Sequence, residues 1–404
     1  MSEPKISVII PTRERCDVLE KCLRTVTAQN YSNLDIIVSD NFSTDNTRDV
    51  VHSADDARVR YINTGKRLSM SHNWEFALSN AGDTGWVTIV GDDDGLLPGS
   101  LNKIAEIIQS TDVLAVRAKP CTYRWPSMTK TGSGDLVVPL RSGHELRQTS
   151  RWLGKVLSGD ATFAQLPLLY TGGFVSMSVL KEIKSRTGVV YKSCIPDVYS
   201  AVAISSVIDR YIFSHEPLAI NGVSRHSIGK SQFSKKDNSA LSPAEKFVSE
   251  GNLPFHEDIP LCSDGHYPKS FQIMVYESYL QSRCLRSVAD ANMHAEQLEV
   301  ILATSGRHDT VINEWGAEFA RMHGLDYDFI RTKARRRKAV LDVTSITRLA
   351  SLAMNTHIVG STEEPIKDVF EASIVAAAIR ADIPGPTKRL LGLVRHAIKM
   401  RQES

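Results

Sequence analysis

The sequence predicts an α/β protein in which a mostly parallel sheet flanked by helices is followed by a mainly helical C-terminal region. Short β-branched runs alternate with helical patterns up to about residue 120, and these runs are apolar on both faces. Strands of a parallel sheet that is covered by helices on both sides have this character. Beyond about residue 243 the apolar residues follow a helical spacing. We therefore expect two domains, over residues 1–235 and 243–404.

The alternation begins at the N-terminus, where residues 5–10 form an apolar run that ends at Pro11. The next segment, 17–29, spaces its apolar residues as one face of a helix does. Further strands are expected over 34–39, 59–62, 85–91 and 112–118. Further helices are expected from Ser43 or Thr44 to 54, over 69–81 and over 98–109.

The regular alternation of expected strands and helices ends after residue 120. Residues 121–139 are expected to form a loop or hairpin, 142–159 a helix that begins at Ser142, 197–208 a helix and 210–220 a strand of antiparallel type. The pair Gly172-Gly173 marks a place where backbone or a ligand approaches closely. The polar stretch 229–243 is expected to be a lid or a domain boundary. Helices are expected over 267–288, 294–305, 311–324 and 366–381.

The composition excludes several classes of protein. A net charge of +2 gives no bulk attraction to nucleic acid, so no nucleic-acid partner is expected. The six cysteines have no zinc-site spacing, which is typical of reduced thiols in the cytoplasm. The N-terminal apolar run is too short for a signal peptide, and no stretch is long enough for a membrane-spanning helix. We expect a cytoplasmic protein that can still dock on a membrane surface.

Polar residues follow three of the expected strands at the point where each strand ends. They are the segments 11–15, 39–47 and the acidic triplet Asp92-Asp93-Asp94. In an open parallel sheet, ligands bind outside the carboxyl ends of the strands, so these segments are expected to line one cleft. The first loop has neither GxGxxG nor a P-loop, and clustered carboxylates suit a hard cation. The pattern favours Mg²⁺ or Mn²⁺ shared with a phosphate-bearing ligand; the alternative is a solvated turn before the next helix.

Three of these segments resemble glycosyltransferase family 2. "SVIIPTRER" is similar to that family's first strand and loop, "DIIVSDNFSTDNT" to its second-strand signature and "GDDDGLLPGSL" to its DXD-containing segment. The resemblance covers about residues 5–230. It implies a GT-A, Rossmann-like fold, and an inverting transferase that uses a nucleotide-diphospho-sugar, UDP- or dTDP-linked. The absence of a QxxRW-like stretch favours single-sugar transfer in polysaccharide or glycan assembly, with a saccharide or lipid-linked acceptor.

The resemblance also implies roles for individual residues on the donor side. Pro11, Thr12 and Arg13 would line the nucleotide pocket, and Asp40 and Asn41 would reach the base and ribose. Asp93 would be the principal metal ligand, and Asp92 would contact ribose or the metal. Asp94 is the weakest of the three as a candidate metal ligand. Gly91 stands where the commoner form has its first Asp, and Asn41 where many members have a second Asp.

On the acceptor side the resemblance implies that Asp197 is the catalytic base, with Pro196 in place of the family's Glu. The alternative is that Asp197 only caps the helix it begins. Family members often have a loop after the last core strand that closes on the diphosphate. Arg225 and Lys230 would bind the donor from this loop, and His226 would bind the metal.

The tail 386–402 is basic and amphipathic, so it either lies on an anionic membrane surface or packs on the protein's own helices. The basic run 333–340 is most simply a solvated helix face. Two other functions stay open. One is a catalytically silent nucleotide-sugar-binding or scaffold module, because of Gly91, Asn41 and Pro196. The other is a nucleotidyltransferase, although its usual glycine- and Lys/Arg-rich first loop is missing.

Overall fold

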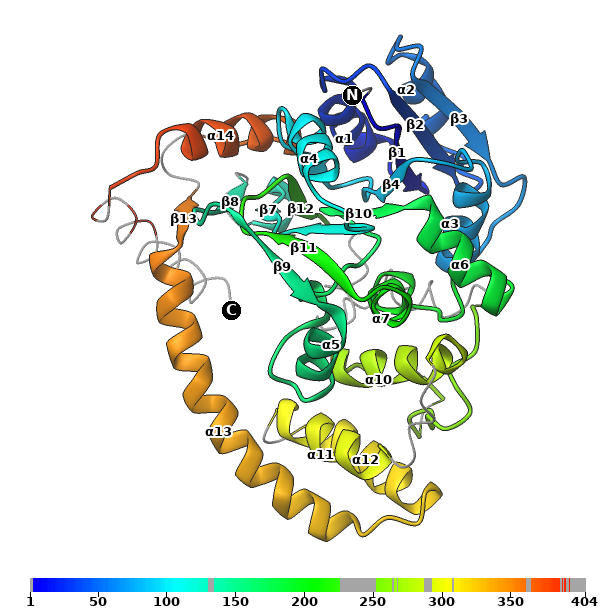
Figure 1. Ribbon diagram of the computed structural model, residues 1–404, viewed down its shortest axis with the longest axis vertical. Coiled ribbons are helices and arrows are strands. Elements are labelled where there is room, and N and C mark those ends of the chain that lie inside the picture. Colours follow the sequence, from blue (N-terminus) through cyan, green and yellow to red (C-terminus); the bar gives the residue numbers. More distant parts are fainter. Residues whose placement is uncertain are drawn as a thin grey trace.

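A large sheet with helices on both faces forms the upper part of the molecule, and a layer of helices lies below it (Figure 1). The computed structural model describes residues 3–129, 134–225, 252–263, 265–266, 268–286, 293–306, 309–360, 365–385, 387, 389 and 392. The observed sheet and the helical C-terminal region confirm the predicted α/β class.

The large sheet has the strand order β3-β2-β1-β4-β10-β6-β11-β9. The first four strands in this order run parallel, β10 runs antiparallel to both of its neighbours, and β9 runs antiparallel to β11. The bounds are β1 Ile6–Thr12, β2 Leu34–Asp40, β3 Val59–Asn63, β4 Trp86–Ile89, β6 Ala115–Ala118, β9 His144–Gln148, β10 Gly173–Ser176 and β11 Arg210–Ser214. The parallel half is the part that the sequence pattern predicted strand by strand.

Alternate residues of the parallel strands point to two apolar layers, as the period of a strand requires. Val8 and Ile10 face α1 and α4, whereas Ile9 and Val87 face α3, α6 and α7. The helices are α1 Cys16–Thr27, α2 Thr47–His52, α3 Met70–Ser79, α4 Ser100–Ser110, α6 Met177–Thr187 and α7 Pro196–Val207. Burial on both faces fixes the strand register, which fixes where each strand ends.

The second sheet begins where the acidic triplet ends and has the order β13-β8-β7-β12-β5. Its strands are β5 Gly95–Leu96, β7 Cys121–Arg124, β8 Asp135–Pro139, β12 Ala219–Val223 and β13 Thr356–Val359. The antiparallel pairing of β7 with β8 confirms the hairpin expected over 121–139. Helix α14, Val369–Ala381, covers this sheet with Val369, Ala372 and Ala376. The C-terminal part of the chain therefore returns to the strands that carry the acids.

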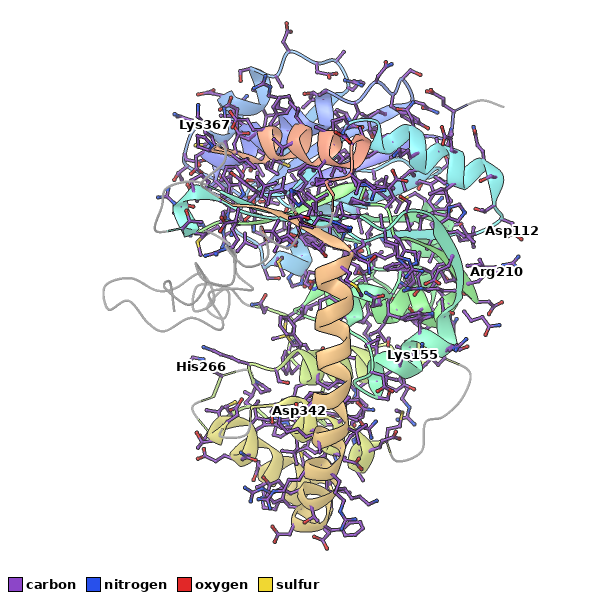
Figure 2. All side chains as sticks on the ribbon, turned by 90° about the vertical axis from the view of Figure 1, so that its left-hand side faces the viewer. Asp112, Lys155, Arg210, His266, Asp342 and Lys367 are labelled. Atoms are coloured by element: carbon purple, nitrogen blue, oxygen red, sulfur yellow. The ribbon has the colours of Figure 1, made fainter. Side chains whose placement is uncertain are left out.

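The helical layer has its own apolar core, to which α5 and α7 also contribute. Its helices are α5 Thr149–Leu157, α10 Phe271–Gln281, α11 His294–Thr304, α12 Thr310–Met322 and α13 Tyr327–Met354. At 28 residues α13 is roughly 42 Å long. It runs along this layer, with Asp342 on its length, and leads back to β13 (Figure 2). None of the helices in the described ranges combines the length and apolar character that a membrane crossing needs.

Two expectations about these elements are wrong. The helix expected from Ser142 is strand β9 over its first part, and helix α5 starts only at Thr149. Pairing of β9 with β11 overrides the helical propensity of this stretch. The single strand expected over 210–220 is divided between β11 and β12, which belong to different sheets, and β11 runs parallel to β6 as well as antiparallel to β9. Strand β13 and the full length of α13 were not expected.

The basic run 333–340 lies within α13, and the structure gives it more contacts than a solvated face has. Arg337 pairs with Glu299 and donates to the Ser158 carbonyl, and Lys338 donates to the Ser305 carbonyl at the end of α11. The expected lid or boundary over 229–243 lies outside the described residues, as does most of the tail 386–402. The division into two domains stays a prediction.

Candidate active site

The ends of β1, β2 and β4 meet at one edge of the large sheet, as the strand-end pattern predicted. Thr12 and Asp40 are register partners at the ends of β1 and β2. The Thr12 hydroxyl donates to Asp92 Oδ2 over 2.9 Å, although 80 positions separate the two residues in the sequence. Parallel strands place their carboxyl ends together, which explains why these distant segments share one cleft.

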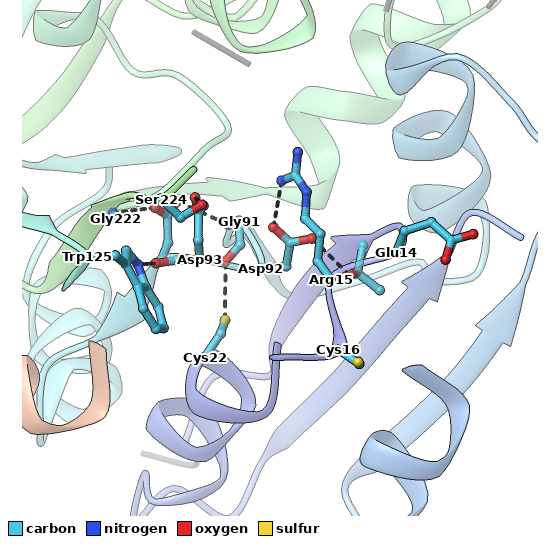
Figure 3. Close-up of polar contacts among 12 residues, drawn as sticks. Glu14, Arg15, Cys16, Cys22, Gly91, Asp92, Asp93, Trp125, Gly222 and Ser224 are labelled. Carbon is cyan, nitrogen blue, oxygen red and sulfur yellow. Dashed lines mark hydrogen bonds and ion pairs between the residues drawn. The ribbon is translucent and has the colours of Figure 1, made fainter. Parts of the chain in front are cut away.

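Asp92 is buried between two donors, Thr12 at the end of β1 and Arg15 in the loop that follows. Thr12 donates to its Oδ2, and Arg15 Nη1 lies 2.9 Å from its Oδ1 (Figure 3). Burial raises the pKa of Asp92, the neighbouring Asp93 adds to this, and Arg15 opposes it. Burial acts to lower the pKa of Arg15, but Asp92 and Asp93 outweigh it and raise the pKa. Arg15 is therefore the fixed cation of the cluster.

Asp93 is buried and faces the loop that follows β12. Ser224 Oγ donates to Asp93 Oδ2 over 2.6 Å, and the Trp125 indole N–H donates to the Asp93 carbonyl over 2.9 Å (Figure 3). A Cβ on Gly222 would lie 1.8 Å from that carbonyl oxygen, so only glycine fits there. Asp93 is thus held by its backbone while its carboxylate is directed towards the loop at 224.

Asp94 is fully buried and joins three segments of the chain. Its Oδ1 accepts from the Gly222 N–H over 2.6 Å, and its Oδ2 accepts from the Gly91 N–H and the Thr171 hydroxyl. The Tyr170 hydroxyl also donates to this carboxylate. Burial and the charge of Asp93 raise the pKa of Asp94 to about 7. Asp94 therefore has a structural role, because it connects the segments around Gly91, Thr171 and Gly222; the sequence did not predict these contacts.

Asp40 and Asn41, at the end of β2, are both engaged with the protein. Asp40 accepts from the Tyr61 hydroxyl over 2.6 Å, from the Asn63 amide and from the Ser43 N–H. The Asn41 side chain pairs with both backbone groups of Leu68, over 2.7 and 2.8 Å. Asn41 therefore clamps the loop before α3, and its role at the base or ribose stays a prediction.

The remaining donor-side candidates lie around the same edge. Pro11 is the last-but-one residue of β1, and Arg13 follows that strand; both are partly exposed. Arg225 follows β12, and its Nη2 lies 3.5 Å from Asp17 Oδ2 at the start of α1, with side chains 64% and 52% exposed. His226 and Lys230 lie outside the described residues.

Asp197 lies in the first turn of α7, where Pro196 is the first residue. Its carboxylate accepts from the N–H groups of Asp197 and Val198 in that turn, whereas the N-cap position is Ile195, which has no side-chain cap. Burial raises the pKa of Asp197, and the Arg117 guanidinium opposes this. Arg117 itself donates to the carbonyls of Ala164 and Thr171, and burial lowers its pKa to about 10. A carboxylate with a raised pKa is a better proton acceptor near neutral pH.

Four residues of the site were not predicted: Arg15, Tyr170, Thr171 and Ser224. Arg15 belongs to the quoted segment 11–15, but nothing in its spacing pairs it with Asp92. Tyr170 and Thr171 directly precede the noted pair Gly172-Gly173. A Cβ on Gly173 would lie 1.8 Å from the Leu168 carbonyl oxygen, so the pair reflects close approach of backbone. The glycine pair was therefore the only feature of the sequence that could have pointed to Tyr170 and Thr171.

The acids fit a divalent cation in their chemistry. Three adjacent carboxylates are buried beside one arginine; burial raises the pKa of Asp92 and of Asp94, and the neighbouring Asp93 adds to both shifts. Mg²⁺ commonly takes one or two carboxylates and completes its shell with water and substrate phosphates. The described residues contain no cluster of three or more side chains able to hold a metal alone.

Part of the chain is similar to known glycosyltransferases. Residues 7–160 match the model of the family described as Glycosyl transferase family 2. The chain is 38% identical over 106 residues to a Campylobacter jejuni protein named GalNAc(5)-diNAcBac-PP-undecaprenol beta-1,3-glucosyltransferase, covering 26% of this chain and 34% of that protein. It is 33% identical over 113 residues to an uncharacterized glycosyltransferase of Nostoc sp., covering 28% of this chain and 35% of that protein. The chain thus spans about a third of the length of these relatives.

Among solved structures, residues 1–349 of S. aureus TarS in complex with UDP-GlcNAc have a TM-score of 0.47 to this chain. The sequence identity is 13%, and the alignment covers 85% of this chain and 92% of that chain.

Proposed function

We propose that the protein transfers a sugar from a nucleotide-diphospho-sugar to an acceptor hydroxyl, because residues 7–160 match the model of glycosyl transferase family 2. The observation that carries the proposal is the meeting of Thr12, Asp40 and the acidic triplet at one sheet edge. Buried carboxylates at this edge suit a donor that brings a diphosphate together with a divalent cation. We expect a UDP- or dTDP-linked donor and Mg²⁺ or Mn²⁺.

Asp93 is the residue that we propose as the protein's ligand to this cation. Both oxygens of Asp92 accept from Thr12 and Arg15, which makes it the weaker candidate. When bound, the cation offsets the charge that develops on the leaving diphosphate. Arg15 balances Asp92, and Asp94 holds the turn, so that the Asp93 carboxylate stays in one position. Pro11, Arg13 and Arg225 are expected to line the donor cleft.

Asp197 is proposed as the base on the acceptor side. It takes the proton of the acceptor hydroxyl, whose oxygen attacks the anomeric carbon from the face opposite the diphosphate. The bond from that carbon to the diphosphate breaks as the new bond forms, so the configuration inverts. Because burial raises the pKa of Asp197, activity should fall on the acid side as this carboxylate becomes protonated.

The acceptor is proposed to be a saccharide or a lipid-linked saccharide in polysaccharide or glycan assembly. The name of the C. jejuni relative includes an undecaprenol-linked acceptor, which supports the lipid-linked form. A lipid-linked acceptor would require contact with a membrane surface. That contact through the tail 386–402 stays a prediction, to be tested by vesicle flotation of the full chain against a chain ending at residue 385.

The test is release of nucleotide from a panel of nucleotide sugars, measured with Mn²⁺, with Mg²⁺ and with EDTA. We expect turnover of at least one donor that EDTA abolishes. Asp197→Asn should lose transfer while keeping donor binding by calorimetry. Asp209→Asn, an exposed acid just after α7, is the matched control and should keep both. Donor binding without any turnover in the wild type would instead indicate a silent nucleotide-sugar-binding module.

A further inference from the structure

Tyr170 lies between the acidic triplet and Asp197, just before strand β10. Its ring stacks on Trp74 of α3, with centroids 5.4 Å apart and 21° between the planes. It packs at the junction of two apolar cores, that of the helical layer and that of α3, α6 and α7. The residue as a whole is partly exposed, whereas its hydroxyl is buried. One face of this ring is therefore fixed by the protein, and part of the residue remains open.

The Tyr170 hydroxyl occupies space beside the glycine that precedes the triplet. A Cβ built on Gly91 would lie 2.5 Å from Tyr170 Oη and 2.8 Å from Asp94 Oδ2. This hydroxyl also donates to Asp94, which the neighbouring Thr171 hydroxyl contacts as well. A side chain at position 91 would therefore displace the phenol. The phenol is held in place at its polar end.

Tyr170 is also within electrostatic reach of Asp93, Asp94 and Asp197; burial first, and then these charges, raise its pKa well above the usual range. The same side chain therefore contacts Asp94, next to the proposed metal ligand, and lies within electrostatic range of the proposed base. In the proposed reaction the sugar must lie between the diphosphate near Asp93 and an acceptor hydroxyl near Asp197. An aromatic ring at that position offers an apolar face to the C–H groups of a sugar.

We propose that Tyr170 is a specificity-determining residue that contacts the transferred sugar of the donor, an inference that depends on the proposed glycosyl transfer. Its hydroxyl is occupied by Asp94, so the ring, fixed by Trp74, makes the contact. Sugars that differ in the orientation of one hydroxyl present different faces to a fixed ring. Binding of the nucleoside diphosphate without the sugar does not involve Tyr170.

The experiment compares Tyr170→Leu with Tyr170→Phe and the wild type. Leucine keeps an apolar side chain but removes the ring, whereas phenylalanine keeps the ring and removes the hydroxyl. The readouts are the ratio of kcat/KM between UDP-glucose, UDP-galactose and UDP-N-acetylglucosamine, and the affinity for UDP by calorimetry. We expect Tyr170→Leu to change the ratio by about 10-fold or more and Tyr170→Phe to change it little. UDP affinity should stay within about 2-fold in both.

Tyr191→Phe is the matched control, because Tyr191 packs edge-on against the same Trp74 with centroids 5.7 Å apart. It should leave the ratio unchanged. If Tyr170→Leu unfolds, the ratio in Tyr170→Phe and Tyr170→Trp, which keep or enlarge the ring, decides: an unchanged ratio in Tyr170→Trp would overturn the inference. An unchanged ratio in folded Tyr170→Leu would overturn it too. Absence of turnover in the wild type with every donor would contradict the proposed function itself.

Discussion

The edge of the large sheet and the helical layer below it hold buried carboxylates in different surroundings. At the sheet edge, Asp92, Asp93 and Asp94 follow one another and accept hydrogen bonds from four segments of the chain, and Arg15 pairs with Asp92. In the helical layer, Glu277 of α10 is fully buried and accepts from the Ser193 hydroxyl over 2.6 Å and from the His256 N–H. No ion pair to Glu277 is found in the described ranges.

A buried acid in each region has a similarly raised pKa, but the causes of the two shifts differ. Burial raises the pKa of both Asp94 and Glu277 to about 7, but only Asp94 also has a neighbouring carboxylate that adds to the effect. A cluster of acids with too little positive charge is suited to receive a cation with its ligand. A solitary buried acid whose hydrogen-bond partners are neutral groups of several segments is suited to hold those segments together. Ser193 lies four residues before Asp197 in the chain, so Glu277 helps to hold the segment that leads to the proposed base.

The largest expected effect separates Asp93 from its neighbour. Asp93→Asn keeps the shape of the side chain but removes the charge that we propose binds the cation. We expect kcat/KM to fall by about 1000-fold or more, with thermal stability close to that of the wild type. The measurements are steady-state kinetics with Mn²⁺ and a melting curve. Activity within about 10-fold of the wild type would show that the proposed metal ligand is misassigned.

Asp94→Asn should act mainly on stability. An amide offers one acceptor oxygen, so its NH₂ group would face either the Gly222 N–H or the Gly91 and Tyr170 donors. Buried hydrogen bonds to a charged group contribute about 1.5–3 kcal/mol each. We therefore expect the free energy of unfolding to fall by about 3–4 kcal/mol. Chemical denaturation measures this. A stability equal to that of Asp93→Asn would remove the distinction between the two acids.

Glu277 provides the pH test of the helical layer. Its pKa is about 7 in the folded chain against an ordinary 4.5, so the folded state holds its proton when the unfolded state has lost it. The contribution of Glu277 to the free energy of unfolding is fully present below the ordinary pKa of 4.5. It is lost as the pH rises towards 7. Glu277→Gln should abolish that loss, on the order of 3 kcal/mol. Urea denaturation between about pH 5 and 8 measures it, with the exposed Glu257→Gln as the control.

How far the sequence predicts each region follows from the range of its interactions. The strands and helices up to about residue 120 repeat a local apolar pattern, and parallel strands bring their ends together, so the meeting of Thr12, Asp40 and Asp92 was predictable. The partners of each acid were not, because Arg15, Thr171 and Gly222 lie between 77 and 128 positions away from it in the sequence. Such contacts depend on tertiary packing, which leaves no periodic signal.

The same limit holds at the level of whole elements. Helices α10, α11 and α12 were predicted from their apolar spacing, whereas the full length of α13 was not. Strand β13 is only four residues long and pairs with β8 from a distant part of the chain, so no local pattern marks it. Strand β9 was expected as helix because its pairing with β11, not its own composition, decides its conformation.

The smallest effect concerns the backbone of the sheet edge. Trp125→Phe removes the indole donor to the Asp93 carbonyl, at 2.9 Å, and keeps an aromatic ring beside Tyr123. Leaving that buried carbonyl without its partner should cost about 1–2 kcal/mol of stability. The Asp93 carboxylate keeps its contact with Ser224, so kcat/KM should fall by less than about 10-fold. Calorimetric melting and steady-state kinetics on one preparation test both parts. A loss of activity as large as that of Asp93→Asn, with stability unchanged, would mean that the carbonyl and not the carboxylate orients the donor.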